Sequence, residues 1–127
     1  RRSFFTDHPK AVVLRAKLAL HGGDQEAIKA RMEELSAKRR ASQPLEMPSA
    51  GSTFKRPEGY FAGTLIEQCG LKGARVGGAE VSRKHAGFVV NAGGATCTDV
   101  LALIKKVQDT VFTATGVTLE PEVKIIR

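Results

Sequence analysis

Apolar residues recur at helical spacing over one long segment near the end of the chain, between Thr96 and Gly116. Their spacing is typical of a helix with one buried face. The apolar positions are Val100, Leu101, Leu103, Ile104, Val107 and Val111. Thr96 and Asp99 have the spacing of a capping box, and a glycine such as Gly116 is typical of a helix C-terminus. The pattern therefore predicts a buried helix that runs to about Thr115.

A weaker stripe predicts a second helix in the first third of the chain. Ile28, Met32 and Leu35 are spaced as on one helix face, and Asp24 before them is a typical N-cap. The segment ends near Arg40 with three consecutive cations. These cations either complement the helix dipole or bind an anion, and the sequence leaves both interpretations open.

Shorter runs predict three strands and one small helix. The strands are expected at 11–20 (AVVLRAKLAL), 88–91 and 117–127, where β-formers are frequent. The helix is expected at 61–69 and is closed by Gly70. Helices and strands intermix without a regular strand–helix–strand rhythm. The expected fold class is therefore α+β, a two-layer sandwich of a small mixed sheet with helices.

Two segments between these elements are rich in proline or glycine. Residues 41–59 contain three prolines and two glycines, and an irregular segment of this length in a compact domain is usually functional. Residues 70–82 contain four glycines, which predict tight turns and close approach of the backbone. They lack the strand–GxGxxG–helix arrangement of a dinucleotide site.

The composition is that of one ordinary domain, with 127 residues of which 42% are hydrophobic. There is no run of eighteen apolar residues, so we expect no membrane partner. Cys69 and Cys97 lie far apart, which favours free thiols and a reducing cytoplasm. The three histidines show no metal-ligand spacing, so we expect no metal site.

The formal net charge of +7 is concentrated in the first half of the chain. Residues 1–56 hold twelve Lys or Arg against six Asp or Glu, whereas residues 57–127 hold eight against seven. Such an excess indicates an anionic partner, or else the solvated face of a helix.

Ser52 is the residue in the proline-rich segment that could carry chemistry. It lies in the run AGSTFKRP, with Lys55 and Arg56 three and four residues further on. The flanks lack the G-x-S-x-G pattern of a hydrolase nucleophile. Two roles remain: Ser52 caps its own turn, or its hydroxyl donates a proton to an enolate that the nearby cations help to bind.

Three separated motifs resemble one enzyme family. They are PSAGSTFKRP (48–57), AGTLIEQCGLKGARVGGAEVSRKHAGFVVNAGGAT (62–96) and LEPEVKII (119–126). In this order they resemble the C-terminal domain of the UDP-N-acetylenolpyruvoylglucosamine reductases, also called UDP-N-acetylmuramate dehydrogenases. The opening RRSFF is similar to the end of that family's second domain and places the family's arginine at Arg1.

The resemblance implies a flavoenzyme of peptidoglycan biosynthesis. NADPH reduces a bound FAD, and hydride then passes to the vinyl carbon of UDP-N-acetylglucosamine enolpyruvate. The carbon beside the carboxylate takes a proton from a serine, which here is Ser52. Glu122 and Arg1 would stabilise the enolic carboxylate. Glu120, two residues before Glu122, lies on the same face of a strand, so periodicity does not separate the two glutamates.

The same resemblance implies that the substrate is bound by Lys55, Arg56 and Tyr60. The first two would meet the diphosphate, as charge-assisted hydrogen bonds require. Many relatives carry asparagine where this chain has Arg56. Tyr60 is either a ligand of the same cleft or an aromatic at the edge of the core.

The resemblance also implies a division of the chain. Residues 1–20 would be the end of the preceding FAD-binding region, and residues 21–127 the substrate-binding domain. The upstream FAD-binding part is absent, so we expect the chain alone to be inactive, monomeric and cytoplasmic. The competing interpretation is a small basic nucleic-acid-binding module, which should interleave cations with exposed aromatics. If the resemblance holds, Ser52 and Glu122 should line one cleft.

Overall fold

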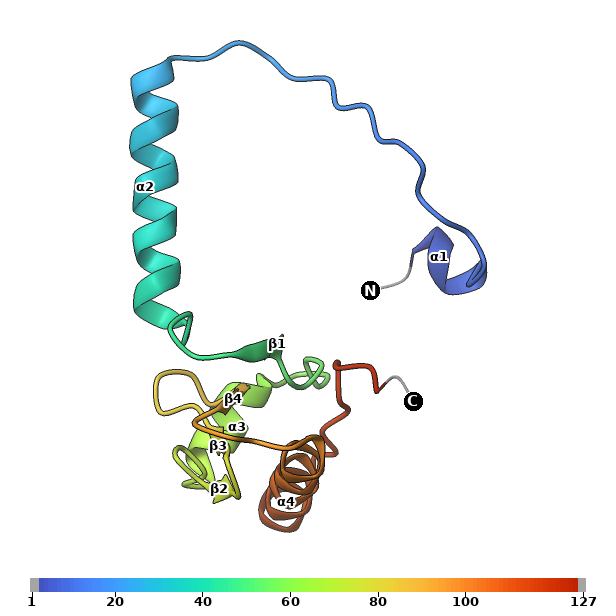
Figure 1. The fold of residues 1–127 in the computed structure, drawn as a ribbon, viewed down its shortest axis with the longest axis vertical. Coiled ribbons are helices and arrows are strands. Elements are labelled where there is room, and N and C mark those ends of the chain that lie inside the picture. Colours follow the sequence, from blue (N-terminus) through green and yellow to red (C-terminus); the bar gives the residue numbers. More distant parts are fainter. Residues whose placement is uncertain (1–2, 126–127) are drawn as a thin grey trace. The chain divides into compact units, whose positions relative to one another are not determined.

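The computed structural model describes residues 3–125, which divide into two units between Met32 and Glu33 (Figure 1). The first unit holds the short helix α1 (Phe4–Asp7), an extended stretch and the beginning of α2 (Gln25–Ser42). The second unit holds the rest of α2 and every strand of the described chain.

The strand predicted at 11–20 is wrong. These residues have no regular secondary structure, and Val12 and Leu14 are 77% and 95% exposed. A strand is stabilised by hydrogen bonds to a neighbouring strand. Among residues 3–125, no strand pairs with this segment. The apolar run therefore has the composition of a strand without the partner that a strand needs.

Helix α2 begins where the sequence predicted it, because Oδ1 of Asp24 accepts a hydrogen bond of 2.7 Å from the Ala27 amide. It ends at Ser42, two residues beyond the expected end. Lys38 and Glu34 pair one turn apart at 2.5 Å. The apolar stripe of this helix, Ile28, Met32 and Leu35, is exposed.

The second unit is built on a four-stranded sheet in the order β1-β4-β3-β2. The strands are β1 (Ser49–Ser52), β2 (Arg75–Val76), β3 (Ala79–Val81) and β4 (Phe88–Asn91). The α+β class is confirmed, but every pairing is antiparallel, so the sheet is not mixed. The reason is that short turns join β2 to β3 and β3 to β4, and such short connections join only antiparallel strands.

The turn between β2 and β3 uses two glycines in the segment where the sequence predicted tight turns. Gly77 has a φ of +52°, and the backbone at Gly78 lies against the loop that leads into the last helix. A Cβ on Gly78 would lie 2.2 Å from the Gly93 carbonyl oxygen. This close approach requires glycine.

Two helices complete the second layer. Helix α3 (Ala62–Gln68) packs against α4 (Cys97–Thr115), and α4 also packs against β2 and β3. Both helices lie where the sequence predicted them, and α4 has the expected capping box and a left-handed Gly116. The large side chains with no exposure in the core are Ile66, Val81, Leu103, Val107, Val111 and Leu119.

The strand predicted at 117–127 is reduced, in its described part, to one bridge. Phe54 and Pro121 form an isolated antiparallel pair. The Thr53 amide, which would continue the ladder, donates to the Gly87 carbonyl instead, so the pairing stays short.

Candidate functional site

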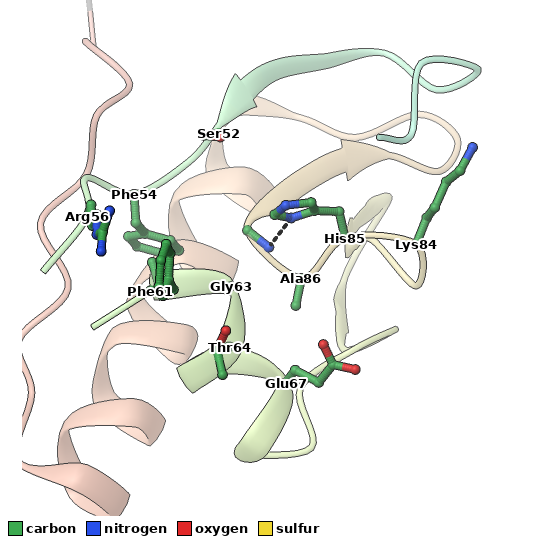
Figure 2. A pocket seen from close by; sticks show the side chains of 12 residues that line it. Ser52, Phe54, Arg56, Phe61, Gly63, Thr64, Glu67, Lys84, His85 and Ala86 are labelled. Atoms are coloured by element: carbon green, nitrogen blue, oxygen red, sulfur yellow. Dashed lines mark hydrogen bonds between the residues drawn. The ribbon is translucent and has the colours of Figure 1, made fainter. Parts of the chain in front are cut away.

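A cavity of about 310 Å³ opens beside the end of β1 (Figure 2). Its lining combines one serine hydroxyl, several cationic or polar side chains and an aromatic floor. These residues are Ser52, Phe54, Arg56, Phe61, Thr64, Glu67, Lys84 and His85, with Ala62, Gly63, Ala86 and Gly87. The loop after β1, helix α3 and the loop before β4 therefore meet at one site.

Local backbone geometry places Ser52 at the mouth of this cavity. A bulge interrupts the pairing of β1 with β4 between Ser49 and Ser52, where Gly51 has a φ of +89°. Such a bulge re-aims the side chains that follow it. Ser52 is exposed and lines the cavity, as a proton donor to a bound molecule must.

Thr53 fixes the backbone next to Ser52 through three hydrogen bonds. Its amide donates to the Gly87 carbonyl at 2.8 Å, and its Oγ1 accepts from the Val89 amide at 2.9 Å. Its carbonyl accepts from the Glu122 amide at 2.9 Å. Thr53 is only 3% exposed. This buried threonine ties together the serine loop, the start of β4 and the C-terminal segment.

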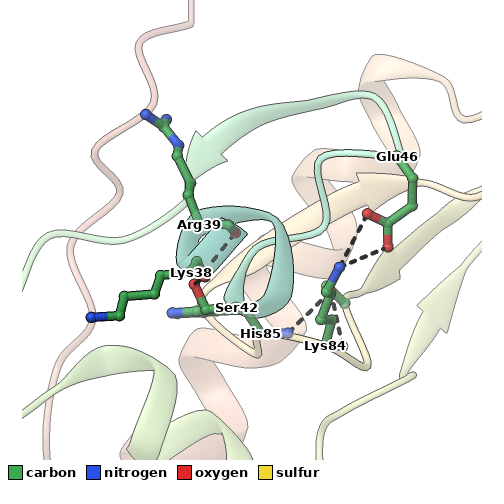
Figure 3. A network of polar contacts seen from close by, with 7 residues as sticks. Lys38, Arg39, Ser42, Glu46, Lys84 and His85 are labelled. Atoms are coloured by element: carbon green, nitrogen blue, oxygen red, sulfur yellow. Dashed lines mark hydrogen bonds and ion pairs between the residues drawn. The ribbon is translucent and has the colours of Figure 1, made fainter. Parts of the chain in front are cut away.

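Lys84 and His85 stand in a tight turn after β3. The buried Ser82 Oγ accepts hydrogen bonds of 3.2 Å from the amides of both residues, which closes the turn. Nζ of Lys84 lies 3.4 Å from Oε2 of Glu46 (Figure 3). A backbone hydrogen bond, and after it Lys84, lower the pKa of Glu46. Glu46 thus orients the ammonium at the rim of the cavity.

The ring of His85 has a defined orientation. Its Nδ1 accepts a hydrogen bond of 3.1 Å from the Gly87 amide (Figure 2). The ring also packs edge-on against Phe88, with 5.0 Å between the ring centres. An Nδ1 that accepts must be unprotonated, so in the neutral ring Nε2 carries the hydrogen. Nε2, the ring nitrogen that remains available to a ligand, is therefore a hydrogen-bond donor.

Arg56 is held from two sides. Its guanidinium lies 3.9 Å above the centre of the Phe61 ring, and its Nε donates to the Tyr60 carbonyl at 3.3 Å. A planar guanidinium stacked on an aromatic ring keeps its remaining N–H groups free for a phosphate or carboxylate. Arg56 and His85 thus present donors to the cavity, whereas the Lys84 ammonium is paired with Glu46.

Of the residues predicted from sequence, Ser52 and Arg56 line the cavity. Lys55 lies outside the lining and forms an ion pair with Glu120. Tyr60 is 49% exposed and also lies outside the lining. Arg1 falls outside the described residues.

Glu122 lies next to the site without lining the cavity. Its side chain is exposed. The Glu122 amide donates a hydrogen bond to the carbonyl of Thr53, the residue that follows Ser52. The predicted common cleft of Ser52 and Glu122 stays a prediction.

Sequence reasoning missed four polar residues that line the cavity. These are Thr64 and Glu67 on α3, and Lys84 and His85. The signal for the last two was their place immediately before the predicted strand at 88–91, which pairs with the serine segment. Among the described residues there is no cluster of three or more metal-ligating side chains, and no helix long and apolar enough to cross a membrane.

Comparison with known proteins identifies the fold and its family. The family "UDP-N-acetylenolpyruvoylglucosamine reductase, C-terminal domain" matches residues 43–126. The chain belongs to this family. The family resemblance predicted from the sequence motifs is thereby confirmed.

Relatives in this family share more than half of the aligned residues. UDP-N-acetylenolpyruvoylglucosamine reductase of Exiguobacterium sibiricum is 58% identical over 115 residues, which cover 91% of this chain and 38% of the relative. The enzyme of the same name from Agathobacter rectalis is 61% identical over 115 residues, with 91% and 37% covered. The chain thus spans about two fifths of the length of the curated relatives it matches.

A solved structure of the family has the same fold. The crystal structure of UDP-N-acetylenolpyruvylglucosamine reductase from Thermus caldophilus superposes with a TM-score of 0.73 at 39% sequence identity. The match covers 87% of this chain and 39% of that chain.

Proposed function

We propose that this chain supplies the substrate-binding, proton-donating C-terminal domain of a UDP-N-acetylenolpyruvoylglucosamine reductase. The observation that carries the proposal is the position of Ser52, whose family motif lies at the mouth of a cavity with Arg56, Lys84 and His85 in its wall. That arrangement suits a substrate with a diphosphate and a carboxylate. Residues 1–20 would then be the end of the FAD-binding region, and residues 21–127 the substrate domain.

The proposed role of Ser52 is general acid. Reduced FAD, when bound, would supply the hydride, and NADPH would return the flavin to its reduced form. Addition of hydride to the vinyl carbon leaves negative charge on the carbon beside the carboxylate. The Ser52 hydroxyl donates its proton to that carbon, a task that even a weak acid performs when it is well positioned. Glu122, with Arg1, would stabilise the enolic carboxylate.

Cationic groups would serve binding in this scheme. Arg56, stacked on Phe61, presents a fork of N–H donors to a phosphate. Lys84 adds a second positive charge. Lys55 and Tyr60, the other ligands predicted from the sequence, lie outside the cavity lining. FAD would be held mainly by the upstream part of the longer protein. Within the described residues of this chain, we found no sequence fingerprint for a dinucleotide.

Calorimetric titration of the chain with UDP-N-acetylglucosamine enolpyruvate tests the proposal. We expect weak binding that falls further as salt is raised, because exposed charges are screened. Arg56→Ala should weaken binding by about tenfold, as expected for loss of a charge-assisted bond. Lys106→Ala, which removes an exposed cation of α4, is the control and should change binding little. Tighter binding of random-sequence DNA than of the UDP-sugar would favour the nucleic-acid module instead.

A further inference from the structure

The C-terminal segment and the serine loop form a short two-stranded ribbon. The Lys55 amide donates to the Glu120 carbonyl at 2.8 Å, and the Glu122 amide donates to the Thr53 carbonyl at 2.9 Å. Phe54 and Pro121 face each other between these two bonds. Pro121 occupies the one position of the ribbon where its missing amide hydrogen breaks no bond.

The far side of the segment is anchored to the core. Leu119 is completely buried, and its carbonyl accepts a hydrogen bond of 2.8 Å from Nε2 of Gln108 on α4. Pro121 also restricts the residue before it to an extended conformation. Glu120, which follows the buried Leu119, has an exposed side chain that can contact the neighbouring strand of the ribbon.

Two glutamates compete for one role in this ribbon. Glu120 and Glu122 are two residues apart, so a slip of two residues would bring the carboxylate of one to the place of the other. Among the described residues, two backbone hydrogen bonds join the ribbon, and the buried Leu119 anchors the segment before it. A side-chain contact across the ribbon would add to this anchor and distinguish the two glutamates.

Lys55 contacts one of the two glutamates. Its ammonium pairs with the Glu120 carboxylate directly across the ribbon, although the two residues are 65 positions apart in sequence. The side chains are 51% and 68% exposed, so the pair adds little to the stability of the fold. Because Lys55 lies outside the cavity lining, the pair is also not part of the wall that would touch a ligand.

We propose that Lys55 and Glu120 are positioning residues, which hold the C-terminal segment in the register that leaves Glu122 available beside Ser52. The role of Glu122 in this statement rests on the proposed function. The register itself is a property of this chain and is testable without any activity.

Amide hydrogen exchange of the 127-residue chain measures the register directly. Lys55→Ala and Glu120→Ala should each speed exchange of the Glu122 amide by roughly threefold, which corresponds to an exposed ion pair. The double exchange Lys55→Glu with Glu120→Lys should restore protection. Reversing the exposed Lys105–Asp109 pair on α4 in the same way is the matched control and should leave Glu122 unchanged. Unaltered protection in both single variants would overturn the proposal.

Kinetics of the full-length reductase separate positioning from ligand binding. Each single variant should slow oxidation of the reduced flavin by the enolpyruvyl substrate by about fivefold, with reduction by NADPH unchanged and KM little affected. The charge reversal should recover the rate to within about twofold. A rise in KM for Lys55→Ala with no effect of Glu120→Ala would instead make Lys55 a ligand. Failure of the wild-type enzyme to use this substrate would refute the proposed function, while the exchange measurement would still decide the register.

Discussion

Replacement of Thr53 by valine removes one hydrogen-bond acceptor from the centre of the domain and keeps the shape of the side chain. The Thr53 Oγ1 is the acceptor for the Val89 amide at 2.9 Å. Both residues are buried, with 3% and 8% of their surfaces exposed. Water therefore cannot easily replace the lost acceptor, and the Val89 amide stays without a partner.

The expected cost follows from that unpaired amide. A buried donor left unsatisfied costs about 1–3 kcal/mol. The added methyl group is buried in an apolar setting and returns part of this, up to about 0.8 kcal/mol. We therefore expect Thr53→Val to lower the free energy of unfolding by about 1–2 kcal/mol, or the midpoint of thermal unfolding by roughly 5–10 °C.

Urea unfolding followed by circular dichroism, together with amide exchange, measures this effect. Thr113→Val on the exposed face of α4 is the control and should change stability by less than about 0.5 kcal/mol. In Thr53→Val the Val89 amide should lose protection beyond the global change. If the variant unfolds at the wild-type urea concentration and the Val89 amide stays protected, the central role of Thr53 is refuted.

Two further predictions concern the turn of Gly78 and the cap of α4. Gly78→Ala should destabilise the domain by about 1–3 kcal/mol, because the new Cβ would meet backbone atoms of Gly93 and Ala95. Gly22→Ala is the control, since a Cβ there would have no atom within 4 Å and should not destabilise the domain. The midpoints of urea unfolding compare the two variants. Hydrogen bonds from Thr96 lower the pKa of Asp99. The ionised Asp99 therefore stabilises the fold above its unfolded-state pKa of about 4, and this stabilisation is lost as the pH falls through the lower folded-state pKa. Asp99→Asn should be less stable than the wild type at pH 7, and this difference in the free energy of unfolding should disappear at the acid end of a pH series. A difference that does not depend on pH would contradict the prediction.

Helix α4 could be predicted closely because its signals are local. Its N-cap Thr96, the partner Asp99 and the left-handed Gly116 all lie within a few residues of the ends they define. Four residues of the apolar stripe are buried, namely Leu103, Ile104, Val107 and Val111, while Val100 and Leu101 are half-buried. Local chemistry and tertiary packing agree here, so periodicity was sufficient.

The short strands could not be predicted in the same way. Strands β2 and β3 have two and three residues, and glycines dominate their surroundings. Strand β2 depends on pairing with β3, and β3 also pairs with β4, which is a property of the folded sheet rather than of the segment. The opposite error occurred at 11–20, where a strand-like composition has no pairing partner in the described chain.

In the candidate site too, residues within a local motif could be predicted, whereas residues brought in by tertiary pairing could not. Ser52 was found from its motif, and the cavity beside it is consistent with that assignment. Lys84 and His85 were missed because only the pairing of Ser52 with Phe88 brings their turn to the serine. The pairing of Lys55 with Glu120 was equally hidden, since it depends on a bridge between distant segments.

Replacement of Ser52 by alanine in the full-length reductase tests the central claim most directly. Stopped-flow absorbance of the flavin resolves its reduction by NADPH from its oxidation by UDP-N-acetylglucosamine enolpyruvate. If Ser52 is the proton donor, oxidation should slow by a factor on the order of 10²–10⁴, while reduction stays near normal and substrate affinity changes little. Equal slowing of both half-reactions, or an unchanged oxidation rate, would show that Ser52 only shapes its turn and would contradict the account.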